Sequence, residues 1–439
     1  MKIMKFGGTS VGKPERMHQV SQLISRDQEA TIVVLSALSG TTNALVEISK
    51  SLASTNKKSA IEKVEALEKQ YRAFILELLS GEALRSKAND IITEHFEFLR
   101  ITQKISLSDA LNKDILAQGE LMSTKLFSLY LEQEKIDHVL LPALDFMQLD
   151  VNDEPDLVVI ESKLKETLAA HTTTKLFVTQ GYICRNAKGE VDNLKRGGSD
   201  YTASLIAAAV KASVCEIWTD IDGMHNNDPR VVDKTVAIEQ LSFDEAAELA
   251  YFGAKILHPT CIWPAQLENI PVKLLNTMQP SAAGTVIKKE AGSEGVKAVA
   301  AKDNIIAIKI KSSRMLLAYG FLRKIFEVFE KYKTSIDMIT TSEVAVSVTI
   351  DTDLHLNEII AELSLIASVE IEKDQTIVSI VGNEIAKTDA VLNKLFAAIN
   401  EIPVTMVSYG GSHHNISLLI PSEYKTKTLQ LVNKGLFNL

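Results

Sequence analysis

The first 290 residues alternate short apolar runs with longer stretches whose apolar residues recur at helical spacing. The short runs are rich in β-branched residues, which is typical of strands buried on both faces of a parallel sheet. We expect such strands at residues 31–35, 176–180, 214–218 and 271–275. Because the longer stretches predict helices between them, the pattern indicates an α/β domain with a mostly parallel sheet sandwiched by helices.

Residues 51–112 interrupt this alternation with a Lys- and Glu-rich stretch at helical spacing. Ile61, Val64, Leu67 and Tyr71 mark its apolar face. The stretch is too short for a sustained heptad repeat. A solvated helical excursion from the sheet domain is therefore favoured over a coiled coil that binds a partner.

The last third of the chain contains an internal repeat. Residues 278–300 are rich in Gly, Ala and Ser without a sustained period, so we place a domain boundary there. Beyond it, residues 323–350 align without a gap with residues 393–420. The longer unit around each aligned segment follows the order strand, helix, strand, strand, helix, which predicts two ferredoxin-like α+β modules with a regulatory or dimerising role. The expected domains are 1–290 and 297–439.

The composition narrows the class of partner. A formal net charge of −9 argues against binding to nucleic acid. No apolar run reaches the roughly 18 residues of a membrane span. Cys184, Cys215 and Cys261 are too far apart for a C-x-x-C pair. We expect each to be a small buried side chain in a reduced, cytoplasmic protein without membrane partners.

The chain opens with MKIMKFGGTS, in which Lys5 precedes the paired glycines Gly7 and Gly8. The familiar phosphate loop carries its lysine after the glycines, so this is a different arrangement. A strand that ends in glycines allows a ligand to approach the backbone closely. In parallel sheets, ligands bind at the carboxyl ends of the strands, so we expect a site at this loop.

A second glycine pair, Gly197-Gly198, precedes an Ala-rich helix. Ser199 is expected to cap that helix, whose first free N–H groups attract an anion. Arg196 offers a planar fork for a carboxylate or phosphate. A capped helix alone would explain the glycines and Ser199, but not Arg196 and Asp200 beside them.

Two further segments carry charge. Residues 218–230 (WTDIDGMHNNDPR) contain Thr219 and Asp220 at an expected strand end and Arg230 after a turn, which by themselves favour an ordinary surface turn. Ser242 and Glu245 form a capping box, and Pro259 is expected to end the helix that they begin. Lys255 falls near that end, where a cation ordinarily compensates the helix dipole.

Together, these segments supply cations beside glycine loops, namely Lys5, Arg196, Arg230 and Lys255. They also supply the carboxylates Glu120, Asp200 and Asp220. Cations and backbone N–H groups for phosphates, with acids for Mg²⁺, indicate phosphoryl transfer. No H-E-x-x-H motif or Ser–His pairing supports zinc hydrolysis or acyl transfer, and no dedicated set of metal-binding residues is assigned.

The motifs in order resemble those of the aspartokinase family: KFGGTS (5–10), SALSGTTN (36–43), GELMS (119–123), RGGSDYTA (196–203), WTDIDG (218–223), DPR (228–230) and FGAKILHP (252–259). The tail, with GFL (320–322) and SIDMITTSEV (335–344), is similar to the tandem ACT modules of the lysine-sensitive class. The resemblance covers essentially the whole chain. It implies an amino-acid kinase fold followed by two ACT modules.

The resemblance implies ATP- and Mg²⁺-dependent phosphorylation of L-aspartate to 4-phospho-L-aspartate, the first step of lysine, threonine and methionine biosynthesis. The positions that match the ATP-phosphate loop are Lys5, Gly7, Gly8 and Thr9. Those that match the aspartate site are Thr42, Glu120, Arg196 and Ser199. Asp200 matches the acid that orients the catalytic lysine, and Arg196 matches the clamp on the α-carboxylate. Those on the nucleotide side are Thr219, Asp220, His225, Arg230 and Lys255. His225 departs from the tyrosine that the family often has near the adenine.

The resemblance of the tail implies a homodimer through the ACT modules, or a tetramer, inhibited by L-lysine bound between ACT modules of two subunits. The matching positions are Met315, Ala318, Phe321, Leu322, Ser335, Ile336, Asp337 and Glu343. Ala318 replaces a family serine that contacts the ligand.

Two rival functions remain at this point. An acetylglutamate or carbamate kinase would lack the tandem tail. A catalytically inactive amino-acid sensor would lack Lys5, Arg196 or Asp200, and all three are present. Because no G-x-G-x-x-G motif occurs, we expect the monofunctional form.

Overall fold

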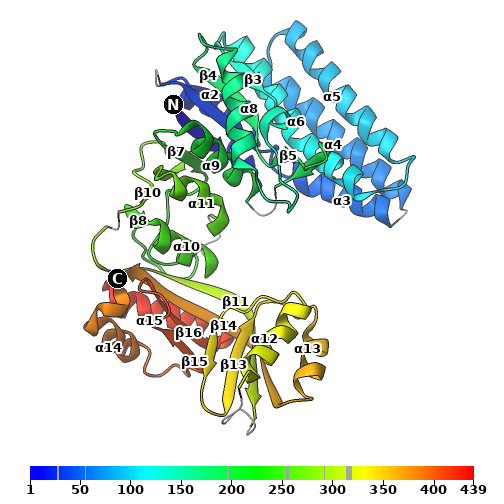
Figure 1. Cartoon of the computed structure of the whole chain (residues 1–439). Coiled ribbons are helices and arrows are strands. Elements are labelled where there is room, and N and C mark those ends of the chain that lie inside the picture. The colour runs from blue at the N-terminus through cyan, green and yellow to red at the C-terminus, as the bar shows by residue number, and fades with distance from the viewer. Residues whose placement is uncertain (27–28, 55, 195–196, 254–256, 291, 313–318) are drawn as a thin grey trace. The chain divides into compact units, whose positions relative to one another are not determined.

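The structure is a computed structural model of the chain, and it describes all residues except 27–28, 55, 195–196, 254–256, 291 and 313–318 (Figure 1). The chain divides into two compact units. The first comprises Met1–Met224 and Leu257–Lys289, and the second His225–Ile256 and Glu290–Leu439. The second unit thus includes a segment, 225–256, that precedes the expected boundary.

The first unit is built on a mostly parallel sheet, as the hydrophobic pattern predicts. Its strand order is β3-β4-β2-β1-β7-β9-β10. The bounds are β3 Val139–Leu141, β4 Leu176–Gln180, β2 Thr31–Leu35, β1 Lys2–Phe6, β7 Cys215–Thr219, β9 Val272–Asn276 and β10 Thr285–Lys288. All neighbouring pairs are parallel except β9 and β10. A separate hairpin pairs β5 (Ile183–Arg185) with β6 (Val191–Asn193).

Helices cover this sheet. They are α1 Gly8–Val11, α2 Pro14–Ile24, α3 Thr41–Ala53, α4 Lys57–Leu78, α5 Glu82–Thr102, α6 Asp109–Gln133, α7 Ala143–Phe146, α8 Leu157–Ala169, α9 Gly198–Val210 and α11 Pro259–Leu267. The predicted excursion forms α4 and α5: α4 packs against α3 and α5, and α5 packs against the long α6 (Figure 1). Its apolar face is buried at Val64, Leu67 and Tyr71, while Ile61 is exposed. These buried side chains join the core beneath β1 and β2.

In the second unit, β8 (Gln240–Ser242) leads into α10 (Phe243–Tyr251). The two repeats follow, and each has the predicted order of elements. The first is β11 Gly295–Lys311, α12 Phe321–Lys331, β12 Ile339–Thr341, β13 Ala345–Ile350 and α13 Leu356–Leu363. The second is β14 Ser368–Asn383, α14 Asp389–Ala398, β15 Met406–Tyr409, β16 Asn415–Pro421 and α15 Lys425–Phe437, with short 3₁₀ turns η2 Ile385–Lys387 and η3 Ser422–Tyr424.

The two modules share one antiparallel sheet. Its order is β12-β13-β11-β14-β16-β15, so the first strands of the two repeats pair along their length. Each module keeps its own apolar core under its own helices. The ACT-like antiparallel region expected from the repeat is confirmed.

The capping box at α10 is present, since Ser242 Oγ accepts from Glu245 N and Glu245 Oε2 accepts from Ser242 N. The prediction that Pro259 ends this helix is wrong. The helix ends at Tyr251, and Gly253 follows with φ +126°, a conformation that only glycine adopts readily. Pro259 instead begins α11, where its missing N–H would have no helical partner.

All three cysteines are buried and free, as expected. Among the helices that the structure describes, none combines the length and apolar character that a membrane crossing requires.

Candidate active site

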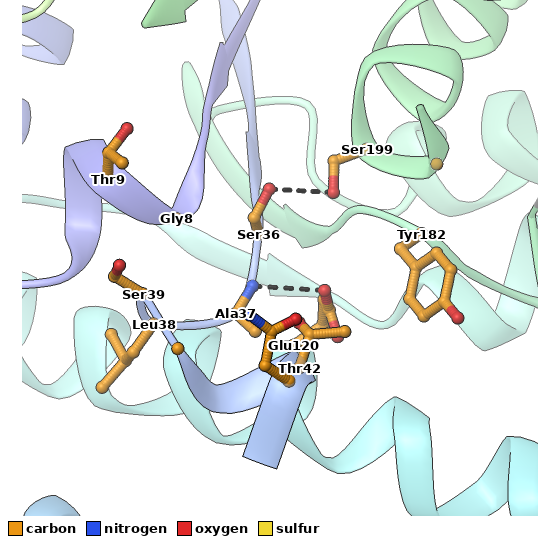
Figure 2. A pocket seen from close by; sticks show the side chains of 13 residues that line it. Gly8, Thr9, Ser36, Ala37, Leu38, Ser39, Thr42, Glu120, Tyr182 and Ser199 are labelled. Carbon is orange, nitrogen blue, oxygen red and sulfur yellow. Dashed lines mark hydrogen bonds between the residues drawn. The ribbon is translucent and has the colours of Figure 1, made fainter. Parts of the chain in front are cut away.

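The carboxyl ends of β1, β2 and β4 border a pocket of about 420 Å³ (Figure 2). Neighbouring parallel strands end at the same edge, so loops distant in sequence meet there. The predicted site residues that line it are Gly8, Thr9, Thr42, Glu120 and Ser199. Ser36 and Tyr182 line it as well.

Lys5 lies in β1 and points its ammonium at the first turn of α9. Its Nζ is 2.7 Å from Asp200 Oδ1, and the two side chains are 11% and 16% exposed. A Cβ added to Gly7 would lie 3.3 Å from the same Nζ. The largely buried ion pair therefore fixes the ammonium beside the glycine loop.

The start of α9 depends on Gly197. Its φ of +70° is left-handed, and an added Cβ would lie 2.2 Å from Cys261 Sγ. Gly197 is the N-cap residue, so the prediction that Ser199 caps the helix is wrong. Ser199 lies one residue inside α9, and its Oγ accepts a hydrogen bond from Ser36 Oγ at 2.9 Å. Its hydroxyl thus faces the pocket rather than the helix end.

Glu120 projects from α6 into the same pocket (Figure 2). The residue is 3% exposed, and its Oε1 accepts from Ala37 N at 3.2 Å. Its Oε2 is buried and has no hydrogen-bond partner among the described residues. Burial raises the pKa of this carboxyl to about 8. A buried carboxyl with one open oxygen is suited to an ammonium group.

Ser36 and Tyr182 line the pocket but were not among the predicted site residues. Ser36 follows β2 directly, and its carbonyl accepts from Ser123 Oγ at 2.8 Å. Tyr182 follows β4, has φ +68°, and donates its N–H to Thr202 Oγ1. A left-handed tyrosine is uncommon, and such residues cluster at functional sites. Since both residues come just after predicted strands, the strand-end rule could have found them.

The residues expected on the nucleotide side belong to both units. In the first unit, Thr219 ends β7, the strand next to β1, and its Oγ1 donates to Asp220 Oδ1 at 3.1 Å. In the second unit, His225 Nδ1 lies 2.7 Å from Thr235 Oγ1. Arg230 is largely exposed, and its guanidinium donates twice to Asp228. Arg196 and Lys255 lie outside the described residues.

The expected effector residues lie in the first repeat of the second unit. Met315 and Ala318 are outside the described residues. Phe321 is buried at the start of α12, Leu322 is 39% exposed, and Ile336 is partly buried. Ser335 and Glu343 are exposed.

The carboxylate of Asp337 is the exception, because its side chain is only 1% exposed. Its Oδ1 accepts from Tyr251 Oη at 2.8 Å and from Lys302 Nζ at 2.6 Å. The acid that the resemblance assigns to a ligand is therefore already paired with the chain's own residues.

Both the N-terminal and the C-terminal part of the chain match known protein families. Residues 1–276 match the Amino acid kinase family, and residues 378–436 match the ACT domain. The chain is thus a kinase of that class with an ACT-containing tail.

Comparison with individual proteins narrows the class. Lysine-sensitive aspartokinase 3 of Escherichia coli is 33% identical, with 99% of each chain covered. Aspartokinase 2, chloroplastic, of Arabidopsis thaliana is also 33% identical, with 99% of this chain and 84% of the relative covered. The structure of E. coli aspartokinase III with aspartate and ADP (R-state) superimposes with a TM-score of 0.87 at 32% identity, over 100% of both chains.

The E. coli enzyme with lysine and aspartate (T-state) superimposes with a TM-score of 0.81 at 32% identity, over 100% of this chain and 99% of that one. The chain belongs to the aspartokinase family, and it is an aspartate kinase.

Proposed function

We propose that L-aspartate binds in the 420 Å³ pocket with its ammonium group at Glu120. The observation that carries this assignment is the buried Oε2 of Glu120, which has no hydrogen-bond partner among the described residues. Thr42 and Ser199 line the same pocket and supply hydroxyl groups for the substrate. Arg196 is assigned to the α-carboxylate by resemblance, because its planar fork matches a carboxylate.

The β-carboxylate of aspartate is the phosphoryl acceptor in this proposal. A carboxylate with a pKa of ~3.9 is already ionised at neutral pH, so no general base is needed. The main barrier is repulsion between two anions, which fixed positive charge lowers. Lys5, held by Asp200, supplies that charge beside Gly7 and Gly8. Thr9, Thr219, Asp220, His225, Arg230 and Lys255 are assigned to the nucleotide.

Mg²⁺ belongs to the same proposal. Within the described parts of the chain, no group of three acidic, His or Cys side chains could hold a metal ion. Mg²⁺ typically takes one or two protein carboxylates and completes its shell with phosphate and water oxygens, and Asp220, which follows the end of β7, fits that role. When bound with the nucleotide, the ion neutralises phosphate charge. Lys5 would add its own fixed charge beside the glycine loop.

The aspartate assignment is tested by Glu120→Gln, with Glu132→Gln as the control on the same helix. Glu132 is half-exposed and pairs with Lys87, so its substitution removes a charge from α6 away from the pocket. We expect Glu120→Gln to raise the KM for aspartate at least about tenfold with little change in the KM for ATP. A change confined to the KM for ATP would contradict the assignment.

We further propose that L-lysine inhibits the enzyme through the first repeat of the second unit, with residues 297–439 as the regulatory region and 1–290 as the catalytic region. The support is the resemblance of the tail and the lysine-bound E. coli relative. Asp337 and Glu343 offer negative charge for an ammonium group of the ligand. The site is assigned to the interface of a homodimer, and the location to the cytoplasm.

A further inference from the structure

The Asp337 carboxylate lies at a junction of three segments of the second unit. Asp337 precedes β12, Lys302 lies in β11, and Tyr251 is the last residue of α10. Both partners donate to the same oxygen, Oδ1. The other oxygen, Oδ2, is buried and has no hydrogen-bond partner among the described residues. One oxygen of Asp337 thus accepts two hydrogen bonds, while the other accepts none from the described residues.

Lys302 has a second acid within reach. Its Nζ lies 3.0 Å from Asp351 Oδ2, and the Asp351 side chain is 41% exposed, against 1% for Asp337. The same Nζ lies 4.6 Å from the centre of the Tyr251 ring. A cation shared between two acids can leave the buried one without losing its ion pair. Lys302 therefore has a low-cost alternative position at Asp351.

A free ammonium group that reaches Asp337 would meet Lys302 already there. Two ammonium groups on one buried carboxylate repel each other strongly, because little water separates them. The ligand and Lys302 therefore compete for the same charge.

We propose that Lys302 is a tethered competitor of the effector: its ammonium occupies Asp337 in the free enzyme, and a ligand ammonium binds there by displacing it toward Asp351. This inference rests on the proposed inhibition by lysine. It assigns Lys302 the role of setting the lysine concentration at which inhibition begins. The environment of the Tyr251 ring would also change on binding, because the Lys302 ammonium that lies over the ring would leave when the ligand binds.

The test is inhibition by L-lysine of the full-length enzyme and of Lys302→Met, each measured against its own uninhibited rate. Methionine keeps the length of the lysine stem and removes the ammonium group. Asp337 in this variant keeps only the Tyr251 hydroxyl, so a ligand ammonium relieves an unpaired buried charge. We expect half-inhibition at about tenfold lower lysine, together with a larger rise in Tm on adding lysine.

Lys309→Met is the matched control, because Lys309 lies on the same strand, is similarly exposed and forms its own ion pair with Glu372. We expect it to be inhibited like the unsubstituted enzyme. Lys302→Arg keeps the cation and adds donors for Asp337, so its half-inhibition should require more lysine than that of the unsubstituted enzyme. This variant tests the inference even if Lys302→Met does not fold.

Unchanged or weaker inhibition of Lys302→Met, or unchanged or stronger inhibition of Lys302→Arg, would overturn the inference while the proposed regulation stands. If lysine inhibits none of these proteins, the proposed regulation itself fails, and the inference fails with it.

Discussion

Lys5 and Asp200 form a largely buried ion pair, with 2.7 Å between Nζ and Oδ1, although one lies in β1 and the other in the first turn of α9. The pair brings the two most distinctive motifs of the chain, KFGGTS and RGGSDYTA, into one site. It also answers why a lysine precedes its glycines, because the strand rather than a helix presents the side chain to the glycine loop.

Lys5→Ala should lower kcat by two to three decades, which corresponds to about 3–4 kcal/mol for one lost transition-state contact. Steady-state ADP release checks this value, with the exposed lysine Lys57→Ala as a control. Because Asp200 is assigned to act through Lys5, Asp200→Ala should cost less than an additional decade in the Lys5→Ala background. Fully additive losses would show that the two residues act independently.

Glu120 should couple aspartate binding to proton release. Burial raises its pKa to about 8, so the free enzyme holds this carboxyl protonated at neutral pH. A bound ammonium favours the ionised form, and the KM for aspartate should therefore fall as pH rises from about 6 to 8. Titration calorimetry in buffers of different ionisation enthalpy measures the released proton. In Glu120→Gln both the pH slope and the proton should disappear.

The raised pKa of Glu120 also predicts how the stability of the protein changes with pH. A folded-state pKa above the unfolded value of 4.5 means that the native state binds the extra proton between these two values. The neutral carboxyl therefore contributes fully to the free energy of unfolding below about pH 4.5. That contribution is lost as the pH rises through the folded-state pKa of about 8. Glu120→Gln should unfold at higher denaturant than the unsubstituted enzyme at pH 8, and the difference should shrink at pH 5. A difference that grows on acidification would contradict the assigned shift.

Arg196→Ala should chiefly raise the KM for aspartate. A clamp on the α-carboxylate acts in the ground state and in the transition state alike, so its loss weakens binding more than it slows the chemical step. Initial rates over a grid of aspartate and ATP concentrations separate the two effects. If only the KM for ATP rises, the division of the site between the two substrates is wrong.

Ala318→Ser should make inhibition by lysine tighter by roughly two- to tenfold, the usual value of one neutral hydrogen bond. Asp337→Asn should remove most of the inhibition, because it deletes the charge that the ligand needs. Lysine titrations of both variants test this reading of the tail. Inhibition by threonine alone, or lysine inhibition that is indifferent to Asp337→Asn, would refute it.

The sequence predicted the elements that depend on local pattern. The strands at 31–35 and 176–180 have the predicted bounds, and those expected at 214 and 271 begin one residue later. The wrong predictions fall at positions whose conformation is set by contacts with distant parts of the chain. Ser199 has the chemistry of an N-cap, but Gly197 takes that position because its left-handed φ and its contact with Cys261 exclude a side chain. No local pattern indicates that Tyr251 and Lys302 converge on Asp337.

Phosphoryl transfer to the β-carboxylate of L-aspartate forms an acyl phosphate, which hydroxylamine can trap. The enzyme is incubated with ATP, Mg²⁺, aspartate and hydroxylamine, and the hydroxamate is identified by mass. We expect aspartyl-β-hydroxamate to form only when both ATP and aspartate are present, and its yield to fall in Lys5→Ala. ATP turnover with acetylglutamate or carbamate, and none with aspartate, would contradict it.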